Sequence, residues 1–162
     1  CFVPKPHSPF QWEAQVTMDE YRRRVNLLRD SITARNVQYN WHDADTSFIE
    51  AALSRGDRRV GGVIEAAWRR GARMEAWSDY FDFKRWLAAF ADCGLDPAFY
   101  ATRERGEDEC LPWSRVDMGV RRELLLRERH RAYKAELSPD CRAACSACGA
   151  QGLLPKGVKC DG

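Results

Sequence analysis

Apolar residues recur every three or four positions along most of this chain, which is the spacing of one face of an α-helix. Thr17 and Glu20 form a capping-box pattern, and apolar residues follow at helical spacing, so a first helix is expected over residues 18–35. Further helices are expected over residues 47–53 and 58–70, between Asp82 and Gly94, in a short turn begun by Asp96 and Pro97, and over residues 119–137.

Two segments depart from the helical pattern. Residues 2–12 are rich in proline, which keeps the backbone extended, so we expect a rigid loop with residues 1–3 as the end of a strand. Residues 37–41 alternate with period two and are rich in branched and aromatic side chains, which predicts a short strand. The order strand, loop, helix, strand is typical of an α/β unit, here followed by a mostly helical region.

Charge and hydropathy narrow the function classes. The chain has 162 residues, of which 26 are basic and 24 acidic, so its formal net charge is only +2. So small a net charge gives no overall positive potential that would attract nucleic acid or anionic lipid. Binding of either would require a local basic patch. No apolar run approaches the roughly 18 residues that cross a bilayer. We therefore expect a cytoplasmic protein without a membrane partner.

Cysteines gather at the C-terminal end. Four of the seven lie in the last 22 residues, as Cys141, Cys145, Cys148 and Cys160. Thiolates spaced C-x3-C-x2-C can converge on one soft metal centre, and Gly149 allows the tight turn that this requires. We expect either zinc or an iron–sulfur cluster, and the spacing does not choose between them. A regulatory disulfide and an unliganded reduced tail are the alternatives.

Other polar groups are weaker candidates. His42 follows the predicted strand and precedes Asp43, so it could act as a base oriented by a carboxylate, although a surface or capping pair is the commoner reading. The segment Ser54–Arg59 could bind an anion, but a helix break with solvated arginines fits it as well. The basic helix over residues 119–137 could meet RNA, although interspersed glutamates favour a solvated face.

Several blocks resemble the C-terminal part of uncharacterised radical SAM proteins that carry an N-terminal cobalamin-binding domain. The resemblance extends over nearly the whole chain, and the Phe-Val-Pro-Lys-Pro-His block is its most specific element. The blocks are residues 2–12, Trp41-His42-Asp43, Ser47, Glu50, residues 54–59, Trp77-Ser78, and the tail from Pro139-Asp140-Cys141.

This resemblance implies a domain organisation. Residues 1–45 would be the C-terminal α/β edge of a partial radical SAM barrel, residues 46–137 a helical family-specific extension, and residues 138–162 a Cys-rich metal-binding tail. The upstream barrel and cobalamin-binding domain would be partners within the same chain. S-adenosylmethionine and cobalamin would bind only to the full-length enzyme, whose substrate and reaction are unknown, and the fragment alone would be inactive.

The resemblance also implies site residues. Five residues would face the cofactor or substrate, with His42 and Asp57 as the weak catalytic candidates; these are His7, His42, Arg55, Asp57 and Arg58. The cysteine tail would hold an auxiliary iron–sulfur cluster or zinc, since it lies far from where the family binds its SAM-cleaving cluster. The alternative is not an enzyme: the chain would be a metal-stabilised RNA-binding or scaffolding module.

Overall fold

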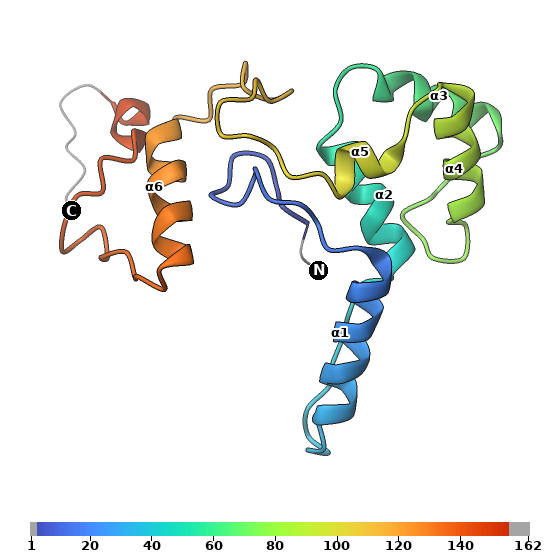
Figure 1. The fold of residues 1–162 in the computed structure, drawn as a ribbon, viewed down its shortest axis with the longest axis horizontal. Helices are drawn as coiled ribbons and strands as arrows, with labels where there is room; N and C mark the ends of the chain where they lie inside the picture. The colour runs from blue at the N-terminus through green and yellow to red at the C-terminus, as the bar shows by residue number, and fades with distance from the viewer. Residues whose placement is uncertain (1–2, 156–162) are drawn as a thin grey trace. The chain divides into compact units, whose positions relative to one another are not determined.

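A computed structural model describes residues 3–155, and in this range every regular element is a helix (Figure 1). Two compact units share this range, one with residues 3–4 and 13–105 and the other with residues 5–12 and 106–155. The helices are α1 (Met18–Ser31), α2 (Ala44–Ser54), α3 (Val60–Arg69), α4 (Phe83–Asp92), α5 (Pro97–Ala101), α6 (Arg122–Tyr133) and the 3-10 helix η1 (Ala150–Leu153).

The predicted α/β edge is wrong for the described residues. Residues 37–41 are extended but belong to no sheet, and no strand forms anywhere between residues 3 and 155. The apolar residues of this segment are not buried on one face. Val37 and Trp41 are about half exposed, and Trp41 stacks on Tyr39 at 5.3 Å between ring centroids. Without a neighbouring strand to accept its backbone hydrogen bonds, a strand-like sequence stays an extended segment.

The first helix shows how its predicted cap is built. The hydroxyl of Thr17 accepts from the amide of Glu20, as the capping box predicts. The Glu20 carboxylate instead accepts from Arg23 and Arg24 on the next turn. The helix ends at Ser31 rather than at residue 35, because Ile32 is already extended.

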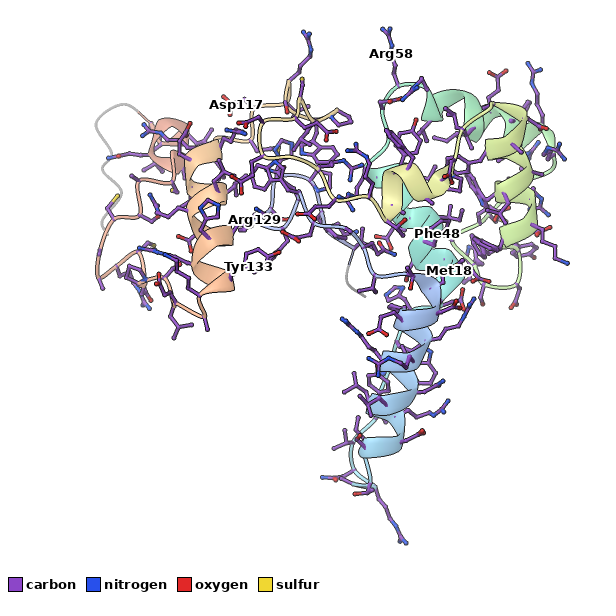
Figure 2. All side chains as sticks on the ribbon, viewed as in Figure 1. Met18, Phe48, Arg58, Asp117, Arg129 and Tyr133 are labelled. Carbon is purple, nitrogen blue, oxygen red and sulfur yellow. The ribbon has the colours of Figure 1, made fainter. Side chains whose placement is uncertain are left out.

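Helices α2 to α5 enclose the core of the first unit. α3 packs on α4, and α2 packs on α5. Their buried faces bring together Phe48, Val63, Trp86, Phe90 and other apolar side chains, and Figure 2 shows Phe48 among these helices and Arg58 pointing away from them. The predicted helices over 47–53, 58–70 and 83–93 are thus confirmed, with small shifts at their ends.

α6 is the main element of the second unit. It is shorter than the predicted helix over 119–137, since Arg121 is extended at its start and Ala135 adopts a positive φ of 54° after its end. The amides of Ala135 and Glu136 bond back to Ala132 and Arg131, which is a Schellman ending. A small apolar cluster packs beside α6, made of Trp12, Leu111, Trp113, Leu125 and Leu126.

Among the helices between residues 3 and 155, none combines the length and the apolar composition that crossing a bilayer requires.

Candidate metal centre

Cys145 and Cys148 lie in a turn whose backbone amides point at both sulfur atoms. The amide nitrogen of Ala147 is 3.5 Å from Cys145 Sγ, and that of Ala150 is 3.4 Å from Cys148 Sγ. In both cases the donor follows the cysteine by two residues. Such N–H donors support the negative charge that a thiolate carries when it binds metal.

Two left-handed residues shape this turn. Ala147 has a φ of 54° and Gly149 a φ of 98°. A Cβ atom on Gly149 would lie 2.8 Å from Arg121 Cγ and 2.9 Å from the carbonyl oxygen of Gly119. Only glycine fits this position without strain and without a clash, so the glycine predicted to complete the turn does so.

Hydrogen bonds hold the cysteine turn against Arg121, just before α6, and against Arg127 within α6. The amide of Arg121 donates to the Cys148 carbonyl oxygen at 2.7 Å, and the guanidinium of Arg127 donates to the Ser146 carbonyl. Both cysteines line one pocket of about 380 Å³ together with Arg121, Gly149 and Gly152. The turn therefore places both cysteines around one space and is itself held by hydrogen bonds to Arg121 and Arg127.

The other two predicted ligands are not added to this pair. Cys141 is exposed and does not line the pocket, and Cys160 lies outside the described residues. Between residues 3 and 155 no group of three potential ligands is gathered at one point. The donor chemistry of the Cys145–Cys148 turn nevertheless fits half of a four-thiolate site.

The predicted cofactor-facing residues of the first unit have structural partners. Asp57 accepts from the guanidinium and amide of Arg59, which holds the pKa of that carboxyl below its ordinary value, while Arg58 is exposed. His42 is also exposed, and its carbonyl oxygen accepts from the Tyr21 hydroxyl. Their predicted role toward a cofactor or substrate stays a prediction.

Asp43 has a helix-capping role. Its Oδ1 accepts from the amides of Asp45 and Thr46 at the start of α2. The carboxylate that could have oriented His42 is thus used as a cap, which was the commoner reading of this pair.

Arg55 is fully buried inside the first unit. Its Nη1 donates to the Ala101 carbonyl and its Nη2 to the Glu13 carbonyl. Arg105, which sequence reasoning did not single out, is also buried and donates to the carbonyls of Tyr100 and Arg55. These arginines join the ends of two helices, and no local sequence pattern distinguishes them from solvated arginines.

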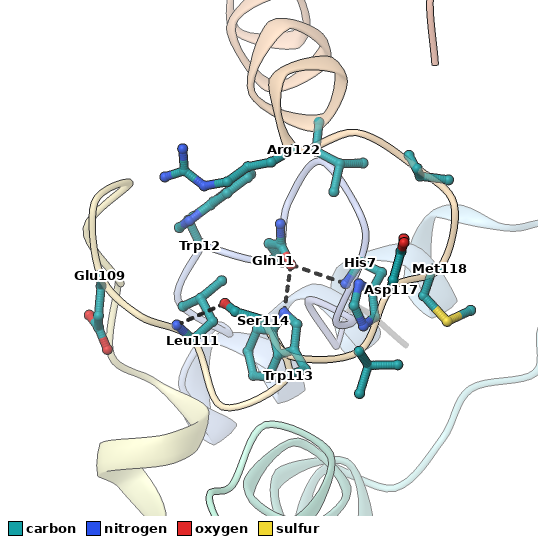
Figure 3. A pocket seen from close by; sticks show the side chains of 13 residues that line it. His7, Gln11, Trp12, Glu109, Leu111, Trp113, Ser114, Asp117, Met118 and Arg122 are labelled. Atoms are coloured by element: carbon teal, nitrogen blue, oxygen red, sulfur yellow. Dashed lines mark hydrogen bonds between the residues drawn. The ribbon is translucent and has the colours of Figure 1, made fainter. Parts of the chain in front are cut away.

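His7 belongs to the second unit, where it lines a pocket of about 220 Å³ (Figure 3). Its φ of 56° is unusual for a residue with a side chain. Its amide donates to Gln11 Oε1 at 3.1 Å, and the same oxygen accepts from the indole of Trp113 at 2.6 Å. Sequence reasoning missed the pairing of Gln11 with Trp113, because the two residues are 102 positions apart.

Comparison with known proteins finds no significant match, whether to a protein family, to a curated protein or to a solved structure.

Proposed function

We propose that this chain is a helical accessory region of a radical SAM enzyme, with a thiolate metal centre in its second unit. The enzyme assignment is supported by the sequence blocks described above, above all the Phe-Val-Pro-Lys-Pro-His block at residues 2–7. The proposal does not include the predicted barrel edge at residues 1–45, because no strand forms between residues 3 and 155. S-adenosylmethionine and cobalamin would bind to other parts of the full-length chain, whose substrate stays unassigned.

The metal centre is supported by one observation above the others, the pair of amides directed at the sulfurs of Cys145 and Cys148. Cys145 and Cys148 would bind the metal, with Cys141 and Cys160 as the remaining ligands. A bound zinc or iron–sulfur cluster supplies cross-linking of the tail, and a cluster would also supply electron transfer.

Stabilisation is the expected role of this centre within the unit. The apolar cluster around Trp12 and Leu125 is small, and the tail segment from residue 138 onward contributes no buried residue to it up to residue 155. Metal ligation would substitute for the missing hydrophobic burial. A reducing cytoplasm, the predicted location, would keep the thiols available for ligation.

No observation comparable to the cysteine turn supports RNA binding by α6. Arg129 pairs with Glu107 at 2.5 Å and Arg131 pairs with Glu128 at 3.2 Å. The Arg131 pair lies within the helix, as the prediction of a solvated helix face expects, whereas Arg129 is largely buried and pairs with a residue outside the helix.

Anaerobic purification followed by metal and sulfide analysis tests the metal centre. Zinc in a colourless protein, or iron with sulfide and visible charge-transfer absorption, would support it. Cys145→Ser and Cys148→Ser should each abolish stoichiometric loading, whereas Cys110→Ser, an exposed thiol outside the pattern, should leave it unchanged. A metal-free protein with freely titratable thiols would contradict the proposal.

The complete reading frame tests the enzyme assignment separately. A barrel with its own cluster-binding cysteine loop elsewhere in the frame is expected. A frame without such a loop would remove the enzyme assignment and leave the metal centre to stand alone.

A further inference from the structure

Arg121 carries a positive charge beside the cysteine turn. We propose that this charge compensates the negative charge of the metal–thiolate centre and thereby strengthens metal binding. The inference rests on the proposed metal centre and gives Arg121 a role there without making it a ligand. Four thiolates carry more negative charge than one zinc ion neutralises, and the net charge of an iron–sulfur cluster tunes it in the same way, so a nearby cation stabilises either centre.

The side chain of Arg121 runs alongside the cysteine turn. Arg121 lines the same pocket as Cys145 and Cys148, and its amide donates to the Cys148 carbonyl oxygen at 2.7 Å. A Cβ atom on Gly149 would lie 2.8 Å from Arg121 Cγ, so the glycine leaves free the space that the arginine stem occupies. Only the rest of this stem separates Cγ from the guanidinium, which keeps the charge within the Debye length of about 8 Å from the turn.

No acidic group within the described part of the chain competes for this charge. Among the described residues that line the pocket, Arg121 alone has a charged side chain. It forms no salt bridge within residues 3–155, whereas Arg127 and Arg142 each pair with an acidic residue. The charge of Arg121 is therefore available to thiolates in the pocket.

The place of Arg121 in α6 supplies an independent argument. It is the N-cap residue of this helix, and its side chain caps no amide. Small residues with a side-chain oxygen are preferred at an N-cap because they accept from the first helical amides. The helix dipole also disfavours a positive charge at this end. Helix stability gives no reason for an arginine here, whereas an anionic centre beside the start of the helix does.

Zinc titration of matched variants tests the proposal, with the affinity measured by competition with a chromophoric chelator. Arg121→Ser removes the charge and provides a better N-cap. It should weaken zinc binding about tenfold or more, while the urea resistance of the metal-free protein stays equal or rises. Arg121→Lys keeps the charge and should restore most of the affinity. Arg115→Ser removes an exposed arginine outside the pocket and should leave zinc binding unchanged.

Ionic strength separates the effect of charge from other effects of the substitution. Arg121 is exposed to solvent, so salt screens its charge. The difference in zinc affinity between the wild type and Arg121→Ser should therefore shrink as the ionic strength rises from about 0.01 M to about 1 M. A difference that is the same at both ionic strengths would overturn compensation by charge.

The contrary outcomes distinguish this inference from the metal centre itself. A wild type that binds zinc with an affinity that Arg121→Ser leaves unchanged would overturn the role of Arg121 and leave the metal centre in place. An equal loss of affinity in Arg121→Lys would do the same. A wild type that takes up no zinc would overturn the inference, and metal and sulfide analysis of the purified protein decides whether the metal centre falls with it.

Discussion

The guanidinium of Arg55 donates to the carbonyl oxygen of Ala101 at 2.9 Å, which joins the C-terminal ends of α2 and α5. A second bond, 2.7 Å long, runs to the Glu13 carbonyl. Burial and, to a lesser extent, the charges of Arg105 and Arg103 lower the pKa of Arg55 to about 10. The group therefore stays protonated at neutral pH, and its charge is stabilised by the two carbonyl oxygens that accept its hydrogen bonds and by the negative charge of Glu13.

Replacing Arg55 by lysine should destabilise the first unit. A lysine ammonium lacks the forked geometry that reaches two carbonyls at once, so one buried acceptor loses its donor. We expect a loss of about 2 kcal/mol or more in the free energy of unfolding, measured by urea denaturation. Arg35→Lys, at an exposed position, is the control and should change it by less than about 0.5 kcal/mol. Equal effects would contradict the structural role of Arg55.

Replacing Gly149 by alanine should impair the metal centre. The added Cβ meets the backbone of Gly119, and alanine pays roughly 1–2 kcal/mol for the left-handed conformation. Metal affinity should fall about tenfold or more, measured by competition with a chromophoric chelator. Gly106→Ala is the matched control, because a Cβ there meets no atom within 4 Å, its φ is not positive and it does not line the cysteine pocket. Identical affinities in the two variants would show that the turn does not position the ligands.

Replacing Gln11 by leucine should loosen the second unit. Gln11 Oε1 accepts from both the His7 amide and the Trp113 indole, and leucine leaves these donors without that acceptor. The expected loss is about 1–3 kcal/mol in the free energy of unfolding, followed by thermal denaturation and by the chemical shift of the Trp113 indole proton. Gln38→Leu, on the exposed extended segment, should have little effect. A native Trp113 signal in the Gln11 variant would argue against this bond.

The contribution of Glu20 to stability should depend on pH. Hydrogen bonds from Arg23 and then Arg24 lower the pKa of this carboxyl from 4.5 to about 2. Because the folded-state pKa is depressed, the stabilisation is present above about pH 4.5 and is lost as the pH falls toward 2. Chemical denaturation of the wild type and of Glu20→Gln should therefore differ at pH 7 and converge near pH 2. A difference that persists unchanged at pH 2 would assign the effect to something other than the carboxylate charge.

Local signals made the helices predictable. Thr17 and Asp82 cap α1 and α4 through side-chain oxygens, and Asp96 caps α5 directly before its first-turn proline. Such caps act between residues two or three positions apart, so they can be read from a short window. The same reasoning gave Gly149 its place in the cysteine turn, since the demand for a left-handed residue is also local.

Local sequence signals could not decide whether residues 37–41 form a strand. Their alternation is the pattern of a half-buried strand, but a strand exists only where another segment accepts its hydrogen bonds. Tyr39 and Trp41 stack on each other instead. Likewise, Arg55 reads as a solvated arginine in its local sequence, and only its burial against Ala101 reveals a structural role.

The sequence by itself thus determined which segments are helical, the caps made by Thr17, Asp82 and Asp96, and the cysteine spacing, because each depends on neighbours within a few residues, but it did not determine where the first and last helices end. The tertiary structure alone decided the absence of a sheet in the described residues, the burial of Arg55, and the pairing of Gln11 with Trp113. It also decided that Trp12, Arg122 and His7 line one pocket. These features join residues as many as 102 positions apart, and such contacts are fixed by packing of the whole unit, which no local pattern encodes.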